Sequence, residues 1–192
     1  MTVPRWSPAH IARYQAYYAS RKVFPSLAPH RWLPRVERLV EACQCLSILD
    51  YGCGPQAHLR EHSLCPMAVY DPGVPAYAAE PAPADLVVCL HTFEHLEARY
   101  LPAVAVHVAA CTQQVLLLGI ACRDSTKPFR DGQPWHSLVQ TPDAWARCLS
   151  ALFPAWHWAA IAPMDTRPGR EAAYVLAREP GLLATALAAC EA

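Results

Sequence analysis

The sequence predicts a single α/β domain in which a doubly wound, mostly parallel sheet carries helices on both faces. Apolar, strand-like runs alternate with helical stretches along most of the chain, a pattern typical of strands joined by crossover helices. Two runs, at residues 85–90 and 113–121, are apolar almost throughout, as strands buried on both faces are. The last two expected strands follow each other without a helix between them. They therefore predict an antiparallel C-terminal hairpin at one edge of the sheet.

The strands are expected where apolar runs end at Gly, Pro or Asp: residues 46–50, 67–71, 85–90, 113–121, 156–162 and 172–178. The helices are expected at residues 8–20, 30–44, 56–62, 98–110 and 141–153, and after Pro180. Thr141 should cap the helix that it precedes, with Pro142 in the first turn. Residues 122–140 are expected to form a long loop, and the last two strands should be joined by a turn near residues 167–170.

The third-strand region of this sheet is expected to be shortened. Only thirteen residues separate Asp71 from Asp85, and four of them are proline. A crossover helix and a further parallel strand need about a dozen residues for the connection alone. We therefore expect the helix in this span to be reduced and the third strand to be vestigial or absent.

Length and composition fit one globular domain. The chain has 192 residues, of which 54% are apolar and 17% charged. We expect one domain over residues 1–192, with a helical N-terminal segment at 1–45 and the sheet-bearing core at 46–192. No apolar run approaches the roughly 18–20 residues of a membrane span, and the N-terminus lacks the apolar core of a signal peptide. These features predict a cytoplasmic protein with no membrane partner.

Net charge and cysteine content argue against a nucleic-acid-binding protein and against a disulfide-bonded one. The formal net charge is zero, so no overall field attracts nucleic acid. Residues 1–40 nevertheless hold seven Arg and Lys against Glu37 alone. We interpret this excess as a solvated helical face, with retention of a phosphate-bearing substrate as the alternative. The nine cysteines are scattered and odd in number, which indicates reduced thiols rather than a disulfide framework.

A glycine loop follows the first expected strand. Gly52-Cys53-Gly54-Pro55-Gln56-Ala57 satisfies the G-x-G-x-x-G/A pattern of Rossmann-like folds, and Asp71 lies nineteen residues past Gly52. Taken alone, the pattern fits a dinucleotide whose pyrophosphate approaches the glycines and whose ribose binds the later acid. Asp50 argues against that cofactor, because a carboxylate two residues before the first glycine would repel a pyrophosphate. S-adenosylmethionine (SAM) has no phosphate and carries two cationic groups, which a carboxylate there would attract.

These segments resemble the class I SAM-dependent methyltransferases. "ILDYGCG" is similar to their first motif, "VYDP" to the acid that ends their second strand, and "ADLVVCLHTFEHLE" to their fourth-strand segment. The resemblance covers residues 46–120. In finer detail, "DGQPWHSLVQTPDAW" resembles a compact methyltransferase-like group common in phage and prophage proteins. The sequence departs from the family pattern at Gln56, where a further glycine is frequent, and in the proline-rich span 72–84.

The resemblance implies a set of cofactor-binding residues. Asp50, Gly52 and Gly54 would shape the cradle and Asp71 would bind the ribose, while backbone near Leu90 and His91 would flank the cofactor. The full expected set adds the neighbours of these motifs: Asp50, Tyr51, Gly52, Gly54, Asp71, Pro72, Leu90 and His91.

Histidines supply the expected catalytic groups. His95 and His136 are the candidates for a general base, because imidazole titrates near neutral pH, and Glu94 could orient His95. Both "HLREH" (58–62) and "HTFEH" (91–95) read H-x-x-E-H, an order known from zinc proteases. The second also resembles the E-x-x-E-H segment with which quinone O-methyltransferases hold a divalent ion, with His91 replacing the first acid. Because such short patterns arise by chance, we predict no metal site from the sequence.

The sequence thus predicts a SAM-dependent methyltransferase whose acceptor is a small molecule, a nucleotide or a modified base. Two alternatives remain. One is a methyltransferase fold that has lost activity and serves as a binding or accessory protein, which Gln56 and the shortened span 72–84 favour. The other is an NAD-dependent oxidoreductase, which Asp50 and the lack of a second substrate domain disfavour.

Overall fold

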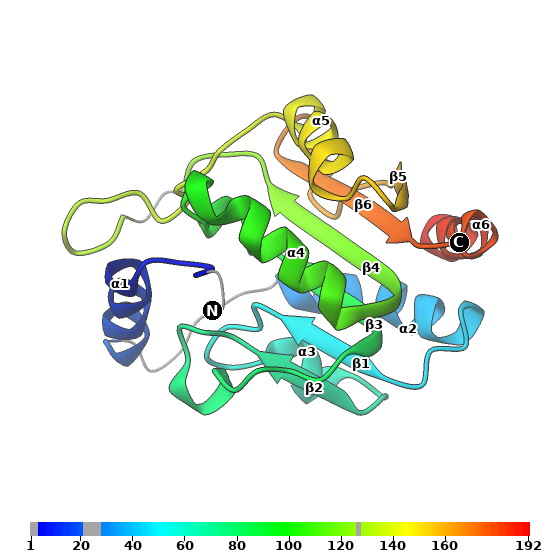
Figure 1. Cartoon of the computed structure of the whole chain (residues 1–192), viewed down its shortest axis with the longest axis horizontal. Helices are drawn as coiled ribbons and strands as arrows, with labels where there is room; N and C mark the ends of the chain where they lie inside the picture. The colour runs from blue at the N-terminus through cyan, green and yellow to red at the C-terminus, as the bar shows by residue number, and fades with distance from the viewer. Residues whose placement is uncertain (1–3, 21–27, 126–127) are drawn as a thin grey trace.

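The computed structural model describes residues 4–20, 28–125 and 128–192, and its centre is one six-stranded sheet (Figure 1). The strand order is β2-β1-β3-β4-β6-β5. The strands are β1 (Ile48–Tyr51), β2 (Met67–Tyr70), β3 (Ala84–Leu90), β4 (Thr112–Ala121), β5 (His157–Ala160) and β6 (Glu171–Ala177). The first four pair in parallel, and β6 runs antiparallel to both β4 and β5. The predicted fold class, including the antiparallel C-terminal hairpin, is confirmed.

Helices cover both faces of the sheet, as a doubly wound fold requires. The helices are α1 (Pro8–Ala19), α2 (Ala28–Ala42), α3 (His58–His62), α4 (Leu101–Cys111), α5 (Pro142–Leu152) and α6 (Pro180–Glu191). One buried core lies between the sheet and α4 with α5, where Val104 and Trp145 are fully buried. The other lies between the sheet and α2 with α6, where Trp32 and Val36 are fully buried. None of the described helices is both long and apolar enough to cross a membrane.

The third-strand region is shortened as predicted. Between β2 and β3 the chain forms a single 3-10 turn, Pro75–Tyr77, and no strand. Because β3 pairs directly with β1, β2 is the last strand on its side of the sheet.

Element boundaries shift from those expected by one to three residues at most ends. The first strand runs one residue further than predicted, to Tyr51. The short helix begins at His58 instead of residue 56, because Ala57 has a left-handed backbone (φ 45°) that a helix cannot include. Thr141 does cap α5, since its side chain accepts a hydrogen bond from the Ala144 N–H.

The topology brings three strand ends to one place. After β1 the chain moves outward to β2 and then returns to the opposite side of β1 as β3. Such a reversal leaves a crevice at the carboxyl ends of the two inner strands, where ligands bind in open α/β sheets. α1 and the loop after β4 lie at this same end of the molecule (Figure 1). The fold therefore places the glycine loop, α1 and the long loop around one crevice.

Candidate active site

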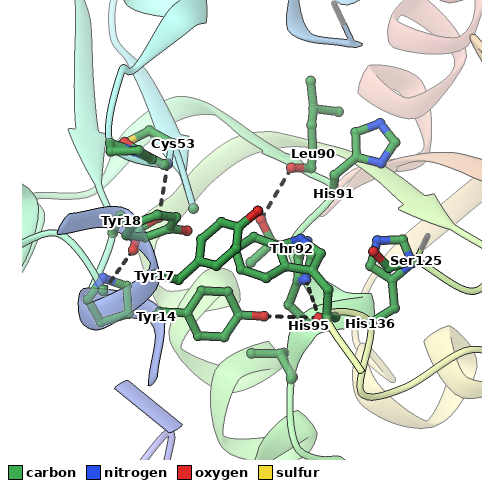
Figure 2. Close-up of a pocket in the computed structure, with 18 of the residues that line it drawn as sticks. Tyr14, Tyr17, Tyr18, Cys53, Leu90, His91, Thr92, His95, Ser125 and His136 are labelled. Atoms are coloured by element: carbon green, nitrogen blue, oxygen red, sulfur yellow. Dashed lines mark hydrogen bonds between the residues drawn. The ribbon is translucent and has the colours of Figure 1, made fainter. Parts of the chain in front are cut away.

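A cavity of about 630 Å³ lies at this crevice, and residues from many segments of the chain line it (Figure 2). Most of the residues singled out in the sequence meet there: Tyr51, Gly52, Gly54, Asp71, Pro72, Leu90, His91, His95 and His136. Asp50 and Glu94 are buried and do not line the cavity. The structure thus gathers predicted site residues that are up to 85 positions apart in the chain, from Tyr51 to His136.

The glycine loop turns its backbone toward the cavity. Gly52 and Gly54 both have left-handed backbones, with φ of 84° and 67°, which side chains rarely tolerate. A Cβ at Gly52 would lie 2.2 Å from the Thr92 Oγ1 atom, so the β1 and β3 ends approach too closely for any side chain there. A Cβ at Gly54 would meet nothing within 4 Å. The two glycines therefore serve different needs, close packing at the first and backbone geometry at the second.

Asp71 ties the glycine loop to the end of β2. Its Oδ2 accepts a hydrogen bond from the Gly54 N–H at 2.9 Å, and its Oδ1 accepts one from the Gly73 N–H at 2.7 Å. Burial raises the pKa of Asp71 to about 6, although the two N–H groups oppose this change. A carboxylate oxygen can accept more than one hydrogen bond. Asp71 can therefore hold the loop and also accept from a hydroxyl in the cavity.

Asp50 lies beneath the loop as a second buried acid. Burial raises the pKa of Asp50 to about 7, and the nearby Asp71 carboxylate raises it further than burial alone would. The fold therefore holds the Asp50 proton more tightly than the unfolded chain does. The stability contributed by the protonated acid is present at low pH and is lost as the pH rises toward about 7.

We expect an Asp50→Asn variant to be more stable than the parent protein at pH 8 and nearly equal to it at pH 4. The amide cannot ionise, so it avoids a cost that the shifted pKa places on the order of a few kcal/mol. Urea unfolding of both proteins at the two pH values measures this difference. A gain of the same size at both pH values would contradict the ionisation of Asp50 as its cause.

Aromatic side chains close the cavity from above. Tyr14, Tyr17 and Tyr18 project from α1 into the cavity (Figure 2). The Tyr17 ring lies 4.1 Å from the Trp135 ring, centre to centre, and the Tyr14 hydroxyl donates to the Trp135 carbonyl at 3.2 Å. We call these four residues the aromatic roof. The three tyrosines come from one helix, whereas Trp135 comes from the distant loop after β4.

His91 is held between two acids. Its Nδ1 lies 3.3 Å from Glu94 Oε1, and its Nε2 lies 3.0 Å from Glu171 Oε1. Burial opposes protonation of His91, but the two carboxylates outweigh it and raise the pKa to about 9. His91 is therefore an imidazolium at neutral pH, and both nitrogens face protein carboxylates. Because both ring nitrogens lie against carboxylates, the backbone is the part of His91 that is available to a ligand in the cavity.

The hydrogen bonds of Glu94 differ from those expected. The sequence suggested that Glu94 orients His95, but Glu94 Oε1 contacts His91 and accepts from the Ala121 N–H at 3.1 Å. The carbonyl of Trp135 orients His95 instead, since it lies 2.9 Å from the His95 Nδ1. The expectation failed because adjacent residues in a 3-10 turn, here Phe93–His95, point in different directions.

His95 and His136 lie together at the cavity wall. Their ring centres are 4.9 Å apart, and the His136 Nδ1 lies 2.6 Å from the Arg123 carbonyl. Burial lowers the pKa of His95 to about 4, which the Glu94 charge opposes. His95 is therefore neutral at pH 7. The ligand atoms of Glu94, His95 and His136 all lie within 4.8 Å of one another.

The sequence did not point to two further residues. Arg123 follows the end of β4, and Arg170 precedes β6, and both line the cavity. Among the described residues, Arg123 Nη1 and Arg170 Nε are buried without a hydrogen-bond partner, although Arg170 Nε lies 3.5 Å from Asp165. Arg123 could have been noticed from its place just after a buried parallel strand, whereas Arg170 lies in a hairpin turn that gives no such signal.

Comparisons with solved structures show the fold, whereas comparisons by sequence find no match. No protein-family model matches the chain, and no curated protein matches it. The DhpI–SAH complex superposes with a TM-score of 0.63 at 17% identity and covers 91% of this chain and 99% of its own. The plantazolicin methyltransferase BamL, in complex with a triazolic desmethylPZN analog and SAH, gives 0.60 at 8% identity over 88% and 91%. Magnesium protoporphyrin IX methyltransferase from Synechocystis PCC 6803 with bound SAM gives 0.51 at 15% identity over 90% and 92%.

These identities are too low to transfer an activity. The superpositions establish only that the chain has the Rossmann-like fold that class I SAM-dependent methyltransferases share, over nearly its whole length. What the chain binds and does must be argued from its own residues.

Proposed function

We propose that this protein binds SAM in the cavity and transfers its methyl group to a small acceptor. The observation that carries the proposal is the pair of buried acids, Asp50 and Asp71, at the carboxyl ends of neighbouring strands beside the glycine loop. A cofactor with a sulfonium and an ammonium group gains from these acids, whereas a pyrophosphate would be repelled. The helix after the loop has only five residues and follows a left-handed residue. Its N-terminus is therefore a poor site for a pyrophosphate. The structural neighbours with SAM or SAH bound support the same choice.

Each proposed cofactor-binding residue would make a different contact with SAM. Asp71 would accept from the ribose hydroxyls, while Gly52 and Gly54 leave room for the cofactor beside the loop. Tyr51 would contribute backbone, because its hydroxyl is bonded to His107 at 2.7 Å on the other side of the sheet. Pro72, Leu90 and the His91 backbone would flank the cofactor, and Asp50 would act through its charge from below.

Methyl transfer is an in-line displacement at carbon, so it needs alignment of the acceptor more than any other aid. The aromatic roof would exclude water and hold the two reactants in line. Removal of the acceptor proton falls to His95 or His136, the neighbouring imidazoles at the wall. Glu94 would act on them through its charge, since its carboxylate bonds to His91 and the Ala121 N–H instead.

The acceptor would carry an anionic group. Arg123 and Arg170 both line the cavity. In the described part of the chain, Arg123 Nη1 is buried without a hydrogen bond, and Arg170 Nε has only a 3.5 Å ion pair with Asp165. Buried, unsatisfied donors are costly, and a carboxylate or phosphate is the partner that a guanidinium binds best. These two residues, rather than the basic N-terminal segment, would then hold the phosphate-bearing acceptor that the sequence offered as an alternative.

Calorimetry tests the cofactor directly. We expect micromolar binding of SAM and of S-adenosylhomocysteine to the purified chain, and none of NAD. Binding of NAD alone would instead support the oxidoreductase, and failure of all three ligands would reject the proposed function. Loss of methyl label from SAM on addition of anionic hydroxyl compounds then tests turnover. Binding without turnover on any acceptor would favour the accessory role.

A further inference from the structure

We propose that Glu94, His95 and His136 form a binding site for one divalent transition-metal ion at the cavity wall. The three residues come from two segments, the 3-10 turn Phe93–His95 after β3 and the loop after β4. Their ligand atoms lie within 4.8 Å of one another. The fold therefore supplies two imidazoles and one carboxylate at a single place beside the cavity.

The hydrogen bonds of the two histidines prepare them as ligands. Each Nδ1 lies against a backbone carbonyl, that of Trp135 for His95 and that of Arg123 for His136. A carbonyl only accepts, so each Nδ1 carries the proton and each Nε2 of a neutral ring keeps its lone pair. Metal-binding histidines almost always donate their second ring nitrogen to such a group, which fixes the tautomer and the orientation of the ring.

Glu94 supplies the independent observation. Its side chain is fully buried, and Oε1 is already engaged by His91 and the Ala121 N–H. Oε2 is also buried, yet no residue in the described part of the chain gives it a hydrogen bond. A buried charged oxygen without a partner is costly, so structures rarely retain one without a purpose. A cation beside the two Nε2 atoms would satisfy Oε2.

The donor set selects the class of ion. Two imidazoles and one carboxylate suit Zn²⁺, Fe²⁺, Co²⁺ or Mn²⁺, whereas Mg²⁺ and Ca²⁺ prefer oxygen ligands throughout. Metal–ligand bonds of about 2.0–2.2 Å require the ligand atoms to move somewhat closer than they lie here. His136 can supply this movement, because it belongs to a loop and not to a helix or strand.

Three protein ligands leave coordination positions open. If the proposed methyl transfer is correct, on which this role rests, an acceptor hydroxyl would occupy one of them. A bound divalent ion lowers the pKa of a coordinated hydroxyl, so the acceptor would lose its proton near neutral pH. With the ion bound, the Nε2 atoms of His95 and His136 would be ligands, so the ion would replace these imidazoles in activating the acceptor.

The test measures metal binding without SAM, so it does not depend on the cofactor or on activity. Protein treated with EDTA and then dialysed is titrated with Co²⁺, Zn²⁺ and Mn²⁺ and followed by calorimetry and by the visible absorption of Co²⁺. We expect one equivalent to bind with micromolar affinity or better. Glu94→Gln and His136→Ala should each weaken binding at least about tenfold, because each removes one of three ligands.

His157→Ala is the matched control, since this exposed histidine on β5 lies outside the cavity. Its binding should equal that of the parent protein. No binding by the parent, or unchanged affinity in His136→Ala, would overturn the proposal. If the buried Glu94→Gln variant fails to fold, His136→Ala decides, because its side chain lies in a loop. Metal binding without SAM binding would reject the proposed function while leaving the metal site in place.

Discussion

An Asp71→Asn variant is expected to bind SAM at least about 100-fold more weakly than the parent protein. Both carboxylate oxygens of Asp71 accept backbone N–H groups, from Gly54 and Gly73. An amide has one oxygen, so one of these N–H groups would face an NH₂ donor, and the ribose would lose a charged acceptor. Loss of a charge-assisted bond together with one unsatisfied donor costs about 3–4 kcal/mol, which corresponds to about two to three powers of ten in affinity. Calorimetry with SAM measures the change.

Asp85→Asn is the matched control for this experiment. Asp85 also accepts two backbone N–H groups, from Leu46 and Ser47, with its Oδ2. It stands at the start of β3, away from the carboxyl ends that form the cavity. The Asp85→Asn variant should therefore lose stability without losing SAM affinity. Equal loss of affinity in both variants would mean that Asp71 acts through general loop order and not at the cofactor.

A Gly52→Ala variant is expected to lose several kcal/mol of stability and with it the cofactor site. The backbone at Gly52 is left-handed, which costs an alanine about 1–2 kcal/mol. The new Cβ would also lie 2.2 Å from Thr92 Oγ1, and displacing a packed group typically costs about 1–3 kcal/mol more. Thermal unfolding and SAM calorimetry measure the two effects.

Two further variants separate the backbone strain at Gly52 from the steric overlap with Thr92. Gly169 also has a left-handed backbone (φ 71°), but a Cβ there would meet nothing within 4 Å. Gly169→Ala should therefore show the strain alone and keep SAM binding. Adding Thr92→Ala to Gly52→Ala removes the two closest atoms and should restore part of the stability. If the double variant is no more stable than Gly52→Ala, the overlap with Thr92 is not the cause.

The sequence was sufficient for the sheet and for the place of the glycine loop, Asp50 and Asp71 at one sheet edge. Parallel strands end at one edge, so the apolar run before Asp50 and the one before Asp71 already place both acids there. The short proline-rich span between Asp71 and Asp85 likewise predicted the missing strand, because chain length alone excludes a crossover helix and another strand. Local pattern and simple geometry carry both inferences.

The contacts of His91, His95 and His136 could not be predicted in the same way. The partner of His91 is Glu171, eighty positions away on an antiparallel strand, and no local pattern joins them. The two H-x-x-E-H segments suggested pairs within one helical turn, but the residues that meet are Glu94, His95 and the distant His136. Side-chain direction within a single 3-10 turn and the path of a long loop decide these contacts, and both depend on tertiary packing.

The shortened span after β2 also bears on how the protein avoids self-association. Among the described residues, no strand pairs with the outer side of β2, so its backbone groups there are open to strand addition by another chain. The strand is only four residues long, and Pro66 and Pro72 lie just outside its ends. A proline has no N–H to donate, so an incoming strand could form only a short ladder. Pro72, which belongs to the proline-rich span that replaces the third strand, thus also helps to protect the edge of β2 from aggregation.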